Sequence, residues 1–99
     1  MIKVLEKQIE KKLIKKVKDK GGLALKLVSP SLDGLPDRLL LLNKGKIAFV
    51  ELKAPGKKLR PLQEKRKRQL KELGFLVFVI DNANGIDAVI EKVIGGDAL

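Results

Sequence analysis

The sequence predicts an α/β fold in which a mixed β-sheet is flanked by helices, in the order α-β-β-β-α-β-α. Segments with helical spacing of apolar residues lie at both ends of the chain, and short apolar runs bounded by turn residues lie between them. A basic helical segment separates the last of these runs from the others. The 99 residues are 44% hydrophobic, which suits one modest core, so we expect a single domain over residues 1–99.

The first predicted helix spans residues 2–20 and ends at Gly21-Gly22. At about 100° per residue, Glu6 points into the middle of its apolar stripe, whereas Glu10 sits at the edge. A carboxylate that points inward suggests a functional role. The stripe consists of Ile2, Leu5, Ile9, Leu13 and Val17.

Three strands are predicted next. Residues 23–28 alternate as a strand does, and residues 29–36 (SPSLDGLP) are rich in turn formers. Residues 37–42 and 46–52 then form a hairpin around the turn at 43–45. We expect the turn to contain three residues, Asn43-Lys44-Gly45, because the pairing register of the hairpin depends on it.

The second half of the chain predicts a helix, a strand and a helix. Pro61 opens the helix over residues 61–73, whose few apolar contacts are Leu62, Leu70 and Leu73. Residues 75–80 (FLVFVI) are continuously apolar, which predicts a strand buried on both faces and parallel to the previous strand. The last helix, residues 84–94, precedes Gly95-Gly96 and carries Ile86, Val89, Ile90, Val93 and Ile94 at helical spacing.

The composition excludes several kinds of chemistry. The chain has no His and no Cys, which excludes the usual zinc sites and nucleophiles paired with histidine. It has no Tyr, which excludes a phosphotyrosyl intermediate. Catalysis would therefore depend on carboxylates, Lys, Arg, Gln, Asn or the two serines, Ser29 and Ser31. This inventory favours Mg²⁺ or Mn²⁺ bound by carboxylates.

The formal net charge of +10 is concentrated in two segments. Residues 3–20 hold eight lysines against three acidic residues, a net +5, and residues 57–73 hold eight basic residues against two acidic ones, a net +6. This distribution favours a surface for a polyanion such as nucleic acid, although two solvated helix faces would give the same counts. With three Phe and no Trp, duplex backbone contact fits better than base stacking.

The predicted hairpin brings charged residues together at one end of the sheet. If Leu42 faces Lys46, Asp37 lies opposite Glu51, and Lys53 shares the face of Glu51. Like charges at paired positions repel, so a cation is expected between the two carboxylates. Convergent carboxylates suit Mg²⁺, which would activate a water molecule, while the lysine stabilises the developing charge.

Two further residues could complete this group. Gln63, one turn into the basic helix, could orient the water or the lysine, and Glu6 could join the metal shell. Each residue also has a structural interpretation: Asp37 can begin a strand after a turn, Glu51 and Lys53 can form a surface pair, and Gln63 and Glu6 can lie at helix surfaces. The coincidence of all five at one site favours the functional interpretation.

The residues Pro36-Asp37 and Glu51-Leu52-Lys53 resemble the PD-(D/E)xK nuclease signature. More narrowly, the stretch from Gly34 to Gln63 resembles the VRR-NUC (virus-type replication-repair nuclease) family. The resemblance implies a restriction-endonuclease-like fold and a Mg²⁺- or Mn²⁺-dependent DNA endonuclease.

The resemblance also implies roles for individual residues. Asp37, Glu51 and the Leu52 carbonyl would be metal ligands, and Lys53 would position the attacking water with support from Gln63. The first-helix carboxylate of the family would be Glu6 or, one turn further, Glu10. We expect DNA contacts from the second basic segment, at Lys57, Lys58, Arg60, Lys65, Arg66 and Arg68.

The resemblance further implies branched duplex DNA, such as a Holliday junction, as the substrate and a homodimer as the active form. The first and last helices are the candidate dimer interfaces. Two alternatives remain open: a basic protein that binds duplex DNA without cutting it, and a restriction-type endonuclease. No apolar run approaches the ~18 residues of a membrane span, so we expect no membrane partner. The expected location is the cytoplasm, or the host cytoplasm if the protein is viral.

Overall fold

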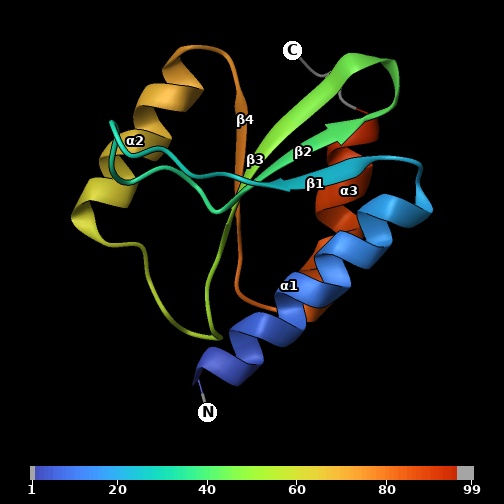
Figure 1. The fold of residues 1–99 in the computed structure, drawn as a ribbon, viewed down its shortest axis with the longest axis horizontal. Helices are drawn as coiled ribbons and strands as arrows, with labels where there is room; N and C mark the ends of the chain where they lie inside the picture. The colour runs from blue at the N-terminus through green and yellow to red at the C-terminus, as the bar shows by residue number, and fades with distance from the viewer. Residues whose placement is uncertain (1, 96–99) are drawn as a thin grey trace.

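Four strands form one mixed sheet in the order β1-β2-β3-β4 (Figure 1). The computed structural model describes residues 2–95, with side chains from residue 5 onward. The predicted order α-β-β-β-α-β-α is confirmed, and short 3₁₀ turns follow β2 and β4. The elements are α1 (Ile2–Asp19), β1 (Leu23–Lys26), β2 (Arg38–Leu42), β3 (Lys46–Leu52), α2 (Pro61–Glu72), β4 (Leu76–Ile80) and α3 (Ile86–Ile94).

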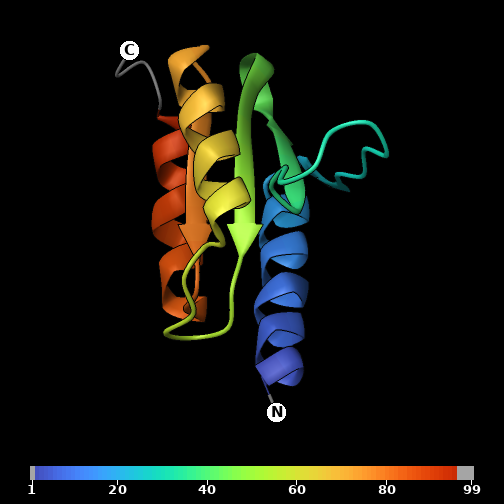
Figure 2. The same cartoon turned by 90° about the vertical axis from the view of Figure 1, so that its left-hand side faces the viewer.

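The helices cover the two faces of the sheet unequally. Strands β1, β2 and β3 pair antiparallel, and β4 pairs parallel with β3, as expected from the helix that connects them. Figure 2 shows α1 and α3 on one face of the sheet and α2 on the other, over β3 and β4. On the two-helix face, alternate strand residues pack against the buried stripes of α1 and α3. The core on this face contains Ile9, Leu13, Val17, Leu40, Leu42, Ala48, Val50, Leu52, Ile86, Ile90 and Val93.

The hairpin has the predicted three-residue turn. Residues Asn43–Gly45 connect β2 and β3, with φ of 63° at Lys44 and 72° at Gly45. Glycine suits this left-handed conformation because it has no Cβ to clash. Leu42 pairs with Lys46, and the register continues without a slip to Arg38 and Val50. Asp37, the residue before β2, is thereby aligned with Glu51.

Several residues predicted to be buried are exposed instead. Phe75 is 42% exposed, and Leu76, Phe78 and Val79 of the edge strand β4 are only half-buried. The prediction that residues 75–80 are buried on both faces is therefore wrong. Leu5 is exposed on the first turns of α1, which extend beyond the ends of the strands in Figure 2. In α2 only Leu70 of the predicted apolar contacts is buried. The other exposed members of these predicted sets are Leu62, Leu73 and Ile94.

Two elements have a boundary that differs from the prediction by two residues. β1 ends at Lys26 rather than at residue 28, because the chain turns away after the Leu27 amide donates to the Asp37 carbonyl at 2.9 Å. The last helix begins at Ile86, after a 3₁₀ turn at Ala83–Gly85. The predicted contributions of the Ile2 side chain and of Gly96 lie outside the described residues. Across the part of the chain that is described, the helices are too short or too polar to span a bilayer.

Candidate active site

The carboxylate of Asp37 is held at the junction of three strands. Its Oδ2 accepts a hydrogen bond from the Leu52 amide at 2.9 Å, and its backbone carbonyl accepts one from the Leu27 amide. The first contact ties the start of β2 to the end of β3. In an extended strand the N–H and C=O of one residue point to the same side. The Leu52 carbonyl therefore points toward the Asp37 side of β3.

Glu51 is a buried carboxylate with an incomplete set of partners. Its side chain is about 5% exposed, and its Oε2 accepts a hydrogen bond from Gln63 Nε2 at 2.8 Å and lies 3.5 Å from Lys53 Nζ. Its Oε1 is buried and has no hydrogen-bond donor among the described residues. A buried acceptor of this kind is costly unless a ligand satisfies it.

The environment of Glu51 favours its protonated form. Burial, followed by the nearby charge of Asp37, raises the pKa of Glu51 from 4.5 to about 7, against the opposing charge of Lys53. Two carboxylates that share a site with one lysine leave a deficit of positive charge. A divalent cation would supply that charge, because hard cations prefer oxygen ligands and displace the proton from a carboxyl group.

Gln63 connects Glu51 to the start of α2. Its Oε1 accepts a hydrogen bond from the Arg60 amide at 2.9 Å, while its Nε2 donates to Glu51. The two contacts fix which end of the amide faces the carboxylate. Gln63 is therefore a buried residue of the site and not a helix surface residue.

We expect Gln63→Ala to lower the free energy of unfolding by about 1–3 kcal/mol, because it removes a buried hydrogen bond to a charged group and the contact that caps α2. Urea denaturation at pH 8 measures the change. Gln8→Ala, at an exposed position of α1, is the matched control and should change the free energy by less than about 0.5 kcal/mol. A loss of similar size in both variants would contradict the role assigned to Gln63.

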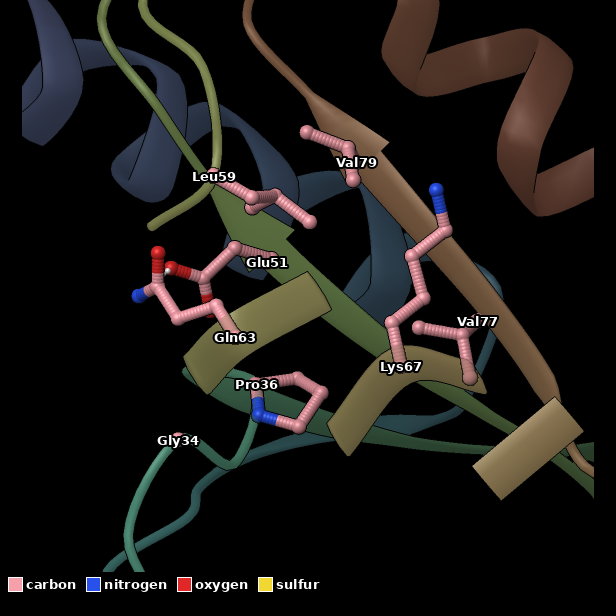
Figure 3. Close-up of a pocket in the computed structure, with 8 residues that line it drawn as sticks. All are labelled: Gly34, Pro36, Glu51, Leu59, Gln63, Lys67, Val77 and Val79. Atoms are coloured by element: carbon pink, nitrogen blue, oxygen red, sulfur yellow. Dashed lines mark hydrogen bonds between the residues drawn. The ribbon is translucent and has the colours of Figure 1, made fainter. Parts of the chain in front are cut away.

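Figure 3 shows the wall that encloses Glu51 and Gln63. It is formed by Leu59 and by Val77 and Val79 of β4, while Lys67 extends along β4 with its ammonium away from Glu51. Gly34 and Pro36 close the wall from the loop before β2. No role was predicted for these wall residues, although Gly34 and Pro36 belong to the Gly-Leu-Pro-Asp stretch that ends at Asp37.

Gly34 is required by a close approach of this loop to α2. Its φ is 82°, and a Cβ at this position would lie 2.8 Å from the Leu62 carbonyl oxygen. A larger residue would therefore strain the backbone and separate the loop from the helix. Because the loop ends at Asp37, this contact helps to align Asp37 with the α2 residues of the site.

A second hollow, of about 280 Å³, lies on the α1 side of Asp37. It is lined by Glu6, Lys7, Glu10 and Asp37. Glu10 is engaged in an ion pair with Arg38 at 3.0 Å, whereas Glu6 is half-buried. Among the residues with described side chains, no three acidic groups are close enough to form a ready metal-binding cluster. Asp37, directly before β2, and Glu51 on β3 occupy aligned positions, and Glu6 shares the hollow with Asp37.

The predicted DNA-contacting residues lie on α2 and on the connection that precedes it. Lys57, Lys58 and Arg60 are exposed on the connection from β3, and Lys65 and Arg68 are exposed on the helix. Arg66 differs, because its Nε donates to the Asp33 carbonyl at 2.9 Å and its Nη1 to Gln69 Oε1 at 2.6 Å. Its guanidinium thus fastens the loop before β2 to α2.

Comparison with known proteins agrees with this geometry. Residues 5–84 match the model of the VRR-NUC domain family. The chain is 48% identical over 79 residues to the candidate nuclease p44 of Acyrthosiphon pisum secondary endosymbiont phage 1. This match covers 80% of this chain and 85% of the relative. A solved VRR-NUC domain superposes with a TM-score of 0.81 at 32% identity, over 87% of this chain and 94% of that chain. The fold is therefore restriction-endonuclease-like.

Proposed function

Because the chain belongs to the VRR-NUC domain family, we propose that it is a divalent-metal-dependent DNA endonuclease. The observation that carries the proposal is the buried Glu51 carboxylate, which lies beside Asp37 and Lys53 and has one oxygen without a donor within the described part of the chain. In this proposal residues 1–99 act as one nuclease domain, and Mg²⁺ or Mn²⁺ is the cofactor.

The proposed mechanism assigns each residue a separate task. Asp37, Glu51 and the Leu52 carbonyl would hold the cation, with Glu6 contributing through a water molecule. The bound cation would polarise the phosphate and lower the pKa of a water molecule. Lys53 would orient the attacking water and stabilise the charge that develops on the phosphate oxygens. Gln63 would keep Glu51 in the ligating orientation, as outer-shell partners of metal ligands do. Hydrolysis would occur in one step without a covalent intermediate.

A cleavage panel tests the proposal. Wild-type protein is incubated with a four-way junction, a flap and a linear duplex, with Mg²⁺, with Mn²⁺ and with EDTA. We expect cleavage of the branched substrates only with a divalent cation. Cleavage of linear duplex at one sequence regardless of branching would instead indicate a restriction-type enzyme. Binding of all substrates without cleavage would indicate a non-catalytic basic protein.

The exposed basic residues of α2 predict a specific salt dependence. Each phosphate contact adds about one unit to the magnitude of the slope when the logarithm of the DNA-binding constant is plotted against the logarithm of salt concentration. The double variant Lys65→Ala/Arg68→Ala should therefore reduce that magnitude by about two. Fluorescence anisotropy with a junction in Ca²⁺ measures it. Lys44→Asn, at the opposite end of the hairpin, is the control and should leave the slope unchanged, since Asn tolerates the positive φ there. If Lys44→Asn reduces the slope by as much per removed charge, the DNA is attracted by the overall positive charge and not by contacts of α2.

One half of the sheet has an uncovered apolar face, which we propose as the dimer surface. On this face Leu23, Leu41 and Ile47 form one row across the strands, and Leu25, Leu39 and Phe49 form the next. Leu23, Leu25 and Ile47 are exposed because α2 covers only the β3 and β4 side. Monomers rarely leave such a patch open, and its lack of charge suits another apolar face better than DNA.

The geometry of this face favours a second copy of the chain. Glu51 lies in the third row of the same face, so a two-fold pairing would place both sites on one assembly, as cutting of a branched substrate requires. The first and last helices are less suitable interfaces, because their apolar stripes are already buried in the core.

We expect Leu23→Glu to weaken dimerisation by about 100-fold or more, because it would place a charge in an apolar interface. Light scattering after size-exclusion chromatography at micromolar protein measures the mass. Leu5→Glu, at another exposed leucine, on α1, should leave the mass unchanged. A dimer that persists in the Leu23 variant would exclude this face.

A further inference from the structure

Arg38 connects three elements beside the candidate metal site. Its Nη2 contacts Glu10 Oε2 on α1 at 3.0 Å, and its Nη1 donates to the Ala24 carbonyl on β1 at 3.2 Å. The residue itself begins β2, directly after Asp37. The Arg38 side chain is 13% exposed and that of Glu10 is 32% exposed, so the ion pair is only partly screened by solvent.

The two α1 carboxylates next to Asp37 differ in their ion-pair partners. Glu6 and Glu10 lie one helical turn apart and both line the hollow next to Asp37. Glu10 is neutralised and oriented by Arg38, whereas Glu6 is not held by an ion pair among the described residues. A free carboxylate at the rim of an acidic hollow can turn toward a cation, and a carboxylate held by a guanidinium cannot do so without losing its partner.

We propose that Arg38 is a positioning residue for the metal site: by binding Glu10 it holds α1 against β1 and β2 so that Glu6 is the helix carboxylate presented to the cation. This inference rests on the proposed function. It also assigns Glu10 a role as the anchor of α1 and not as a ligand. Loss of Arg38 would allow α1 to shift and would move Glu6 away from the cation.

A double-mutant cycle tests the inference through metal binding. Isothermal titration calorimetry measures Mn²⁺ affinity in wild type, Arg38→Gln, Glu6→Gln and the double variant. Arg38→Gln should weaken Mn²⁺ binding by about tenfold, as loss of an outer-shell partner does, and should have no further effect in the Glu6→Gln background. Equal weakening in both backgrounds, or no weakening in either, would overturn the inference.

Three further variants separate positioning from simple stability. Arg38→Lys should retain part of the affinity, and the exchange Glu10→Arg with Arg38→Glu should recover affinity lost in either single change. Lys16→Gln breaks a 3.2 Å ion pair between α1 and Asp87, remote from the hollow, and should leave Mn²⁺ affinity unchanged. If Lys16→Gln weakens Mn²⁺ binding as much as Arg38→Gln, the effect is general loosening of α1 and the inference fails.

Failure of the inference can be told from failure of the proposed function. If wild-type protein binds Mn²⁺ and cuts DNA, but the effects of Arg38→Gln and Glu6→Gln on Mn²⁺ affinity are additive, only the role proposed for Arg38 is contradicted. If wild-type protein neither binds Mn²⁺ nor cuts, the proposed function and the inference fall together.

Discussion

Glu51→Gln is expected to lower DNA cleavage by at least about 10³-fold while leaving the fold intact. The substitution keeps the shape of the side chain and an oxygen that can accept from Gln63 Nε2. It removes the negative charge through which Glu51 would hold a cation, and amide oxygens are weaker ligands for Mg²⁺ than carboxylates. Single-turnover cleavage of a junction in Mg²⁺ at pH 8 measures the loss.

The same substitution is expected to stabilise the protein above neutral pH. The pKa of Glu51 is raised from 4.5 to about 7, so the folded state binds more protons than the unfolded state between these values. The stabilisation that Glu51 contributes is therefore fully present below pH 4.5 and is lost as the pH rises through 7. The free energy of unfolding falls by about 3 kcal/mol over this range. Glu51→Gln removes this loss, so its advantage over wild type should grow from pH 5 to pH 8.

Thermal unfolding across pH, with and without Mg²⁺, checks both parts. Wild-type protein at pH 8 should gain stability from Mg²⁺ because the cation binds the folded state, and the Glu51→Gln variant should gain little. A variant that is less stable than wild type at pH 8, or that cuts junctions at more than a tenth of the wild-type rate, would contradict the role of Glu51.

Lys53→Ala is the second large effect, with an expected loss of about 10²–10⁴-fold in cleavage rate. Lys53 lies 3.5 Å from Glu51 and is mostly buried, so its ammonium can act on a water molecule or phosphate at the site. DNA affinity should stay within about threefold of wild type, since the lysine provides only one of many positive charges.

Lys67→Ala is the matched control for Lys53. Both lysines lie near Glu51, but Lys67 extends along β4 with its ammonium directed away from Glu51 (Figure 3). We expect Lys67→Ala to change the cleavage rate by less than tenfold. Equal losses in the two variants, or a loss of DNA binding that accounts for the lost cleavage of Lys53→Ala, would exclude a catalytic role for Lys53.

The hairpin and its charged end were predictable because they depend only on the turn length and on residue spacing within one short segment. Three residues between Leu42 and Lys46 fix the register, and the register aligns Asp37 with Glu51. Period-two alternation then places Lys53 on the face of Glu51, as its 3.5 Å contact confirms. The roles of these residues in catalysis stay predictions.

Long-range packing decided the features that the sequence could not predict. The contact of Gln63 with Glu51 depends on how the connection before α2 folds back. The burial of residues 75–80 was overestimated because an apolar run does not reveal that its strand lies at a sheet edge. The pairing of Glu10 with Arg38 was likewise not predictable, because the two residues are 28 positions apart in the chain.

The most direct test of the central claim is cleavage of a four-way junction by wild-type protein and Glu51→Gln, titrated with Mg²⁺ at pH 8. Wild-type protein should cut the junction only when Mg²⁺ is present, and Glu51→Gln should bind the junction equally well without cutting it. Cleavage by wild type in EDTA, or wild-type rates in the variant, would contradict it.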